Sequence, residues 1–272
     1  MTEYSFINGQ ITPVSEANLN INDLALLRGY GVFDFFRVID GNPIFLDDYL
    51  NRFENSMNGL GLTTAFSRQY LTDSIFELIR LNSHPLLGIK MVCTGGYAND
   101  GYTPTKTNLF MLARPFRFHP YEQGLKLMTV NHQRELHQVK SINYLTPISL
   151  LPKMKTIGAD DVLYFSRGYI TESSRSNVFI IKNGTLITPN EGMLSGITRK
   201  RILEFANEIM LVEVRQVSID ELFSADEVFL SASTKRISPV TCIDKMEYKS
   251  GHFTRLLFER LLLEEAKFDI IS

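Results

Sequence analysis

Lys140 is the residue whose surroundings point most directly to covalent chemistry. It lies in the segment HQVKSINYL, a mostly uncharged stretch that follows an apolar run. A solvated loop lysine is the ordinary interpretation, because lysine is seldom buried. If the amine is instead partly buried, desolvation lowers its pKa from a reference value of about 10.4 and makes it a nucleophile for imine formation. Lys140 is therefore a candidate for bonding to a carbonyl compound.

Glu172 is a second candidate, in the segment ITESSRSNVF. We expect it just after one strand and just before the next, in a turn where a glutamate is usually solvated. A carboxylate held near a ring nitrogen would instead keep that nitrogen protonated, which a pyridine cofactor needs if it is to accept electrons. The residue alone leaves both interpretations open.

The segment LSGITRK places Gly196, Ile197 and Thr198 directly at the start of a helix predicted over 198–210. Glycine followed by a hydroxyl residue is common at a simply capped helix start. The same arrangement also suits an anion, because free backbone N–H groups and the positive end of the helix dipole point at it. A phosphate is the anion that we consider here.

The segment LSASTKR offers further hydroxyl groups, from Ser231, Ser233 and Thr234, between two predicted strands. Hydroxyl-rich loops of this kind also bind phosphate. Arg52, on an early predicted helix, could supply the countercharge. One ion pair at ~4 Å contributes about 4 kcal/mol at an effective dielectric constant near 20, so a single arginine would matter.

Hairpins, helices and strands must position these residues. Asn-Gly and Asp-Gly accept the two positive φ angles of a tight hairpin turn, and such turns are predicted at Asn8-Gly9, Asp40-Gly41 and Asn183-Gly184. Apolar residues at helical spacing predict helices over 47–60, 67–81, 198–210 and 253–267. Strand-like runs are GIKMVCT, NLFMLAR, LKLMTV, DVLYFS, NVFIIK, TLIT, EVFL and ISPVTCI. This irregular alternation favours an α+β fold with mixed sheets over a doubly wound parallel sheet.

Prolines mark two interruptions in this pattern. The stretch PFRFHPYEQG contains two prolines, so we place a domain boundary there. We predict an N-terminal domain over 1–117, a linker over 118–124 and a C-terminal domain over 125–272. Pro147 and Pro152 cut the apolar run after Lys140, so any helix there starts late or bends.

The composition limits the classes of function. Of 272 residues, 44% are hydrophobic and 21% charged, as in an ordinary globular protein. The formal net charge of -2 argues against a nucleic-acid partner held by bulk electrostatics. The 2 cysteines and 5 histidines lack disulfide-scaffold or metal-ligand spacing, so no metal is expected. With no visible signal peptide and no run of about 18 apolar residues, we expect a cytoplasmic protein without a membrane partner.

The order and spacing of these segments resemble the class IV pyridoxal-phosphate aminotransferases. That family includes branched-chain aminotransferases, D-amino acid aminotransferases and aminodeoxychorismate lyases. The resemblance covers nearly the whole chain, through the blocks FINGQITP, LLRGYGVFDFFRV, FLDDYLNRFENS, VKSINYL, ITESSRSNVFIIKNG, LSGITRKRI and DEVFLSASTKRISPV. It implies a small N-terminal α+β domain, a larger C-terminal pseudo-barrel domain with the cofactor between them, and a homodimer whose neighbouring subunit completes the substrate pocket.

By this resemblance, Lys140 forms the Schiff base with pyridoxal 5′-phosphate (PLP) and shuttles the proton between the substrate Cα and the cofactor. Glu172 matches the carboxylate on the pyridine nitrogen. The other implied cofactor contacts are Arg52, Tyr144, Asn177, Gly196, Ile197, Thr198, Ser233 and Thr234. Tyr144 departs from the family spacing by one residue. The implied substrate contacts are Phe33, Thr94 and Gly95.

The resemblance is less informative about the substrate. D-amino acid enzymes typically carry Thr-Arg-Gly where this sequence has Thr94-Gly95-Gly96, so their carboxylate-binding arginine is missing. The tyrosine-and-arginine pattern of branched-chain enzymes is not clear at 87–90 either. Phe33-Asp34 resembles the Phe-Glu or Tyr-Glu of transaminases and favours amino transfer from an amino acid, for example a branched-chain L-amino acid, to a 2-oxo acid.

Two alternatives stay open. One is an aminodeoxychorismate lyase that releases pyruvate, and the other is a non-catalytic PLP-binding protein. The intact Lys140, Glu172 and phosphate residues argue against the second, because a binding role needs no proton-shuttling lysine.

Overall fold

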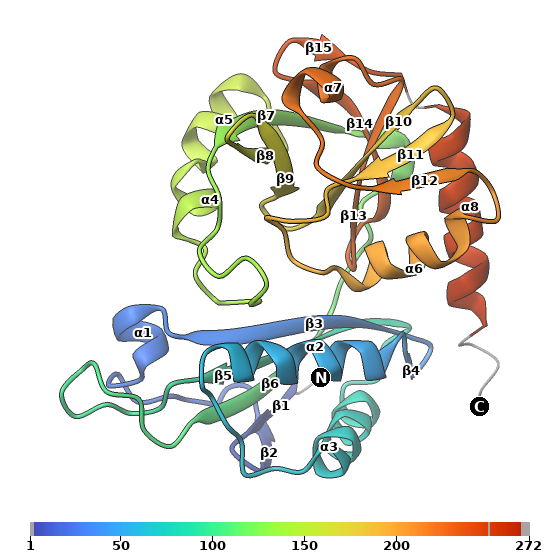
Figure 1. Cartoon of the computed structure of the whole chain (residues 1–272). Coiled ribbons are helices and arrows are strands. Elements are labelled where there is room, and N and C mark those ends of the chain that lie inside the picture. The colour runs from blue at the N-terminus through green and yellow to red at the C-terminus, as the bar shows by residue number, and fades with distance from the viewer. Residues whose placement is uncertain (1–2, 250, 268–272) are drawn as a thin grey trace. The chain divides into compact units, whose positions relative to one another are not determined.

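A computed structural model describes residues 3–249 and 251–267 (Figure 1). Within these residues the chain divides into two compact units, each described by itself below. Unit 1 comprises residues 3–117 and 139–143, and unit 2 comprises residues 118–138 and 144–267 apart from residue 250. Both combine helices with sheets, and unit 2 is built on a barrel-like mixed sheet, so the predicted α+β class is confirmed.

The units differ from the contiguous segments that the prolines predicted. Residues 118–124, predicted as a linker, belong to unit 2, where the short helix η1 (Tyr121–Gln123) buries Tyr121. Residues 139–143 return to unit 1 because their backbone bonds to the edge of its sheet. The predicted domains also included residues 1–2, 250 and 268–272, which lie outside the described residues.

Unit 1 is an antiparallel sheet of six strands in the order β2-β1-β6-β5-β3-β4. The strands are β1 (Tyr4–Ile7), β2 (Gln10–Pro13), β3 (Gly31–Ile39), β4 (Asn42–Pro43), β5 (Leu86–Thr94) and β6 (Asn108–Pro115). The helices are α1 (Leu24–Arg28), α2 (Leu46–Gly59) and α3 (Arg68–Leu81). Asn8, Gly9, Asp40 and Gly41 all have positive φ, so the two hairpins predicted in this unit are confirmed.

The sheet of unit 1 buries one face under α2 and α3 (Figure 1). On β3 this face carries Phe36, whose ring centroid lies 5.9 Å from that of Tyr49 on α2. Side chains alternate between faces along a strand, so Phe33 and Phe35 lie on the opposite face, where they are partly exposed. The alternation of β3 thereby separates a packed side from an accessible side.

Unit 2 contains nine strands in one mixed sheet. The strands are β7 (Leu125–Asn131), β8 (Asp161–Ser166), β9 (Tyr169–Ser173), β10 (Asn177–Lys182), β11 (Thr185–Thr188), β12 (Leu211–Val214), β13 (Glu227–Ala232), β14 (Arg236–Ile243) and β15 (Met246–Glu247). The path runs β12-β11-β10-β13-β14-β7-β8-β9, and β9 also pairs with β10. The strands from β10 around to β9 therefore close into a barrel, and the hairpin predicted at Asn183-Gly184 joins β10 to β11.

Apolar side chains fill the barrel and cover its outside. One buried cluster takes residues from every barrel strand, namely Leu127, Leu163, Ile170, Val178, Leu230 and Val240. A second cluster packs the outer face against the helices α6 (Ile197–Ala206) and α8 (His252–Ala266). The remaining helices are α4 (Leu145–Ser149), α5 (Leu151–Ile157) and α7 (Ile219–Phe223). Burial of these clusters is the main stabilising contribution to the unit.

Several element boundaries differ from the predictions in instructive ways. Pro147 lies inside α4 and Pro152 at the start of α5, so the apolar run forms two short helices, which confirms the predicted bend. Helix α6 ends at Ala206 and not at 210, because the next N–H groups form tight turn bonds before β12 begins. Glu172, expected after a strand, lies within β9.

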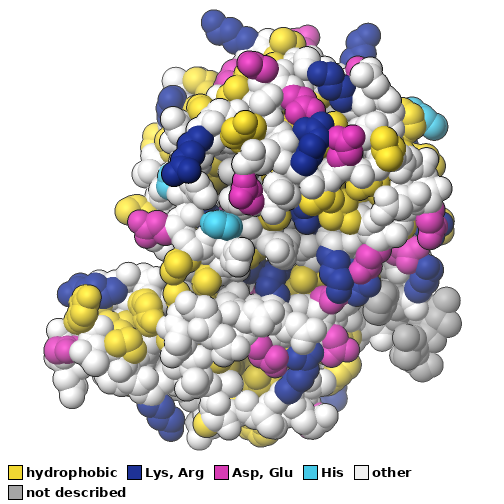
Figure 2. Space-filling view, viewed as in Figure 1, with side chains coloured by type: hydrophobic (Ala, Val, Ile, Leu, Met, Phe, Trp, Pro, Cys, Tyr) yellow, Lys and Arg dark blue, Asp and Glu magenta, His cyan; other side chains and the backbone are white. Residues whose placement is uncertain are grey.

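The surface gives no single-sign field on the face that Figure 2 presents, where cationic and anionic side chains are interspersed. This agrees with the formal net charge of -2. No helix in the described part of the chain combines the length and the apolar character needed to span a bilayer.

Candidate active site

Lys140 lies on an extended segment, residues 139–143, that runs along β3 in unit 1. Its carbonyl oxygen accepts a hydrogen bond from the Phe33 N–H at 2.9 Å. Its own N–H donates to Ser56 Oγ of α2 at 3.1 Å. Because both main-chain groups of Lys140 are bound, its backbone is fixed against the strand and the helix of this unit.

The ring of Phe33 has two ammonium groups beside it. Lys140 Nζ lies 4.6 Å from the ring centroid and Lys90 Nζ lies 4.9 Å from it. Lys90 on β5 pairs with Phe35 of β3, so it is a diagonal neighbour of Phe33 on the same face. Both cations are attracted to the ring, and partial burial lowers the pKa of Lys90. Lys90 thus adds a second positive charge near the predicted nucleophile.

Arg52, predicted as a phosphate contact, binds Asp34 through two parallel hydrogen bonds. Its Nε donates to Oδ2 at 2.9 Å and its Nη2 donates to Oδ1 at 2.7 Å. The Asp34 side chain is 0% exposed and that of Arg52 is 11% exposed. Asp34 therefore faces α2 and orients the guanidinium.

Thr94 and Gly95, predicted to contact substrate, belong to a buried corner at the end of β5. Thr94 Oγ1 donates to Asp23 Oδ2 at 2.8 Å, and Asn108 Nδ2 donates to the same oxygen at 2.7 Å. At Gly95, a Cβ would lie 2.7 Å from the Tyr30 ring. The Thr94 hydroxyl is thus committed to Asp23, and Gly95 permits close packing of Tyr30.

A shift in strand pairing sets the direction of Glu172 in unit 2. The register of β9 against β8 changes by one residue between Leu163 and Phe165. Such a bulge reverses the alternation of faces, and bulges often redirect a side chain next to a functional site. Glu172 then shares a face with Asn177, its direct partner on β10. This reversal has no signature in the composition of the strand.

Glu172 is only 5% exposed, and both of its carboxylate oxygens accept hydrogen bonds from the protein. Oε1 accepts from Arg134 Nε at 2.7 Å, and Oε2 accepts from the Leu194 N–H at 2.9 Å. Arg134 Nη2 also donates to the His137 carbonyl at 2.6 Å, which holds the guanidinium in place. An ionised carboxylate offers about four acceptor positions, so a further N–H donor can bind. Sequence analysis missed Arg134 because nothing local links it to a residue 38 positions away.

Asn177 holds the other main-chain polar group of Leu194. Its Nδ2 donates to the Leu194 carbonyl at 2.8 Å. Its Oδ1 lies against Gly196, where a Cβ would be 1.9 Å from that oxygen. Glu172 and Asn177 therefore bind the N–H and the carbonyl of one residue and fix the loop that leads into α6.

The first turn of α6 has the donors that an anion requires. Its N-cap residue, Gly196, has no side chain, and helix geometry leaves the N–H groups of Ile197 and Thr198 without intrahelical acceptors. Thr198 is 2% exposed, and its Oγ1 has no hydrogen-bond partner among the described residues. The buried hydroxyl of Ser231, cross-strand from Asn177, likewise lacks a partner in the part of the chain described. These donors fit a phosphate.

The remaining predicted cofactor residues lie in loops of unit 2. Ser233 and Thr234 connect β13 to β14, close along the chain to Ser231, and the Thr234 carbonyl accepts from the His119 N–H at 3.4 Å. Tyr144 is the N-cap residue of α4. Within unit 2 the structure thus links Glu172, Asn177 and the start of α6 through Leu194.

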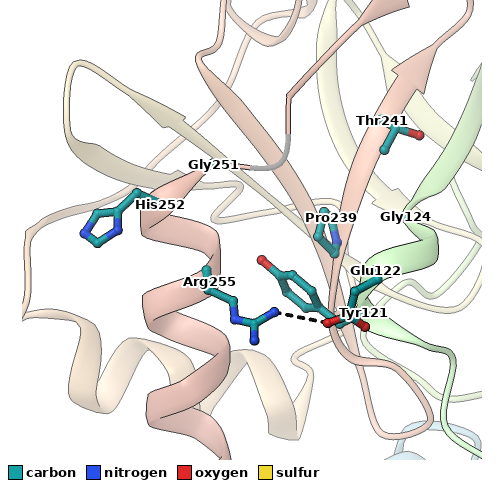
Figure 3. Close-up of a pocket in the computed structure, with 8 residues that line it drawn as sticks. All are labelled: Tyr121, Glu122, Gly124, Pro239, Thr241, Gly251, His252 and Arg255. Atoms are coloured by element: carbon teal, nitrogen blue, oxygen red, sulfur yellow. Dashed lines mark hydrogen bonds and ion pairs between the residues drawn. The ribbon is translucent and has the colours of Figure 1, made fainter.

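A separate cavity of about 510 Å³ lies between η1, β14 and α8 (Figure 3). Arg255 projects along it over the Tyr121 ring, 5.1 Å from the centroid, and donates to Glu122 at 3.1 Å and to Glu259 at 2.8 Å. The arginine charge is thereby balanced by two carboxylates. No predicted site residue lines this cavity, and we assign it no part in the chemistry.

Comparison with known proteins adds independent information. The family model for amino-transferase class IV matches residues 31–243. A D-alanine aminotransferase of Bacillus licheniformis is 30% identical over 255 residues, which cover 90% of this chain and 89% of the relative.

Solved structures share the fold over nearly the whole chain. The branched-chain aminotransferase of the archaeon Thermoproteus uzoniensis, solved with norvaline, has a TM-score of 0.89 at 23% identity, over 98% of this chain and 97% of that chain. The fold IV-transaminase of Curtobacterium pusillum has a TM-score of 0.82 at 26% identity, over 93% of both chains.

Replacing Gly196 tests the packing at the start of α6. We expect Gly196→Ala to lower the free energy of unfolding by about 1–3 kcal/mol, because the new methyl group overlaps Asn177 Oδ1. Urea unfolding of the protein without cofactor measures this. In an Asn177→Ala background the same change should cost less than about 0.5 kcal/mol, since the obstructing oxygen is gone. Equal costs in both backgrounds would contradict the described contact.

Proposed function

Because the chain belongs to the class IV aminotransferase family, we propose that it transfers an amino group from an amino acid to a 2-oxo acid with PLP as cofactor. The observation that carries the proposal is the Glu172–Leu194–Asn177 arrangement, which joins a buried carboxylate to a helix start. At that start the Thr198 hydroxyl has no hydrogen-bond partner among the residues that the structure describes. A protonated ring nitrogen suits the carboxylate, and a phosphate suits the helix start. PLP carries both groups on one ring.

In this proposal Lys140 Nζ is the group that bonds to PLP and that moves a proton at the substrate Cα. Glu172 would accept a hydrogen bond from the N–H of the pyridine ring and so keep that proton on the ring nitrogen. Arg134 supplies the cationic partner of Glu172, because a buried carboxylate without such a partner is strongly disfavoured. When bound, PLP supplies the electron-withdrawing ring that proton removal at Cα requires.

The N–H groups of Ile197 and Thr198 and the hydroxyls of Thr198, Ser233 and Thr234 would hold the phosphate. Arg52 adds positive charge, and Asp34 fixes the orientation of its guanidinium. Asn177 and Gly196 support this turn, and Tyr144 is proposed to lie near the cofactor 3′ oxygen. We assign unit 1 as the small domain and unit 2 as the larger cofactor-binding domain.

Lys90 supports carboxylic acids as substrates. Every amino acid and every 2-oxo acid carries a carboxylate group. The Lys90 ammonium group beside the Phe33 ring would attract that carboxylate toward Lys140 Nζ. Phe33 then forms the apolar contact and Lys90 the charged one.

We also propose that the protein works as a homodimer in the cytoplasm. Helices α4 and α5 expose several large apolar side chains, with Leu145 76%, Ile148 60% and Leu151 54% exposed. Exposed apolar groups of this kind favour contact with another protein surface. Sedimentation of the purified protein measures the assembly directly.

A substrate panel tests the reaction. The purified protein with PLP is given L-leucine, L-glutamate, D-alanine and D-glutamate as donors and several 2-oxo acids as acceptors. A new amino acid and the oxo acid of the donor, formed in equal amounts, would support the proposal. Pyruvate from aminodeoxychorismate without amino transfer would replace it with the lyase. Bound PLP with neither activity would indicate a binding protein.

Lys140→Ala tests the nucleophile. We expect it to abolish the visible absorption band of lysine-bound PLP and to lower turnover by about three orders of magnitude or more, because the bonding amine is removed. Lys153→Ala, at an exposed position on α5, is the control and should retain both. A Lys140→Ala protein with an unchanged band and turnover would refute the assignment.

Lys90→Met tests carboxylate binding. Losing one screened ion pair should raise KM for donor and acceptor about three- to tenfold, with kcat changed less than about twofold. Lys106→Met, at an exposed loop position of the same unit, should leave both constants unchanged. A fall in kcat at constant KM would show that Lys90 acts elsewhere in the reaction.

A further inference from the structure

Lys235 is a buried lysine that the proposed reaction does not use. Its side chain is 10% exposed, and its Nζ lies 3.3 Å from Asp161 Oδ2 and 3.1 Å from Ser176 Oγ. Burial lowers the pKa of Lys235, while the charge of Asp161 opposes that shift. A buried ion pair contributes little net stability, because desolvation of two ions offsets their attraction. The role of this ion pair is therefore to be sought in the segments of the chain that it joins.

Asp161, at the start of β8, is the centre of a buried cluster. Its Oδ1 accepts from Ser174 Oγ, and its Oδ2 accepts from Ser173 Oγ at 3.4 Å. These serines follow Glu172 directly: Ser173 ends β9, and Ser174 begins the turn that joins β9 to β10. The cluster therefore ties the chain just beyond Glu172 to β8.

Lys235 comes to this cluster from a different loop. It directly follows Ser233 and Thr234 between β13 and β14, and its N–H donates to the Ala232 carbonyl at 3.1 Å. The ammonium group and the two hydroxyl residues thus belong to one tight turn. Through Nζ this turn is bonded to Asp161 and to Ser176 of the turn beyond Glu172.

We infer that Lys235 is a positioning residue for the cofactor. Its ion pair with Asp161 fixes the turn that carries Ser233 and Thr234 relative to the turn that follows Glu172. It thereby sets the spacing between the groups that bind the phosphate and those that bind the ring nitrogen. The pyridine ring of PLP is rigid and its phosphate is attached by a short arm, so only a limited range of that spacing fits the cofactor. The inference rests on the proposed function.

Lys235→Met tests this role, since it keeps the apolar stem and removes the ammonium group. Dissociation constants are measured by absorbance titration for PLP and for pyridoxal, which lacks the phosphate. We expect PLP to bind about ten- to a hundredfold more weakly, the size of loss that metal sites show when a partner that orients a ligand-binding group is removed. Pyridoxal should change less than about twofold, because Ser173 and Ser174 still tie the Glu172 turn to Asp161.

A phosphorus NMR spectrum gives a second readout that does not depend on activity. The resonance of bound PLP should move toward that of free PLP in Lys235→Met. Lys182→Met is the matched control, because Lys182 bonds to Ser224 on the surface of the same unit and not to this cluster. It should leave the affinities and the resonance unchanged.

Two outcomes separate the inference from the proposed function. Equal losses for PLP and pyridoxal, or no loss for either, would overturn the positioning role and leave the transaminase proposal intact. A wild-type protein that binds no PLP would overturn both. If Lys235→Met does not fold, Lys235→Met/Asp161→Asn removes both buried charges, and PLP should still lose more affinity than pyridoxal does.

Discussion

The candidate site of unit 2 depends on the pairing of Glu172 on β9 with Asn177 on β10, where the barrel closes. The two side chains lie on one face and bind the N–H and the carbonyl of Leu194. Closure of a barrel fixes its strands in one register, so the acid and the amide cannot move independently. The start of α6 is held by the same pair. One register therefore determines the positions of both the carboxylate and the first turn of α6.

Buried ion pairs orient the charged groups of both units. Glu172 is held by Arg134 in unit 2, and Arg52 is held by Asp34 in unit 1. Such pairs add little net stability, yet losing one partner typically costs about 3–5 kcal/mol because a buried charge remains. Each ion pair thus adds little to the free energy of folding, but moving one of its charged groups away from the other costs much more. This is the property required of groups that must stay oriented toward a charged ligand.

Sequence patterns predicted the features whose cause is local. Asn8-Gly9, Asp40-Gly41 and Asn183-Gly184 form hairpins because their backbone preferences act within the turn itself. The helices followed from apolar spacing, with ends displaced by a few residues, as expected where capping and turn bonds compete. The resemblance to the family was confirmed by the family model. The roles of Lys140 and Glu172 came from that resemblance and stay predictions.

The features that could not be predicted involve residues distant in sequence or a change of side-chain direction. The partner of Glu172 is 38 positions away, and that of Asp34 is 18 positions away. The bulge in β9 reverses a face without any unusual residue, and residues 139–143 join unit 1 through main-chain bonds that every sequence can make. Thr94 matched a substrate position by resemblance, and its hydroxyl donates a hydrogen bond to Asp23, 71 positions away.

The alternation of β3 separates residues that hold unit 1 together from residues near the proposed reaction. Asp34 and Phe36 point into the packed face, so their replacement would disturb the ion pair to Arg52 or the contact with Tyr49. Phe33 points the other way, toward the amines of Lys90 and Lys140. Changes on that face alter charge and shape near the proposed reaction without opening a cavity in the core.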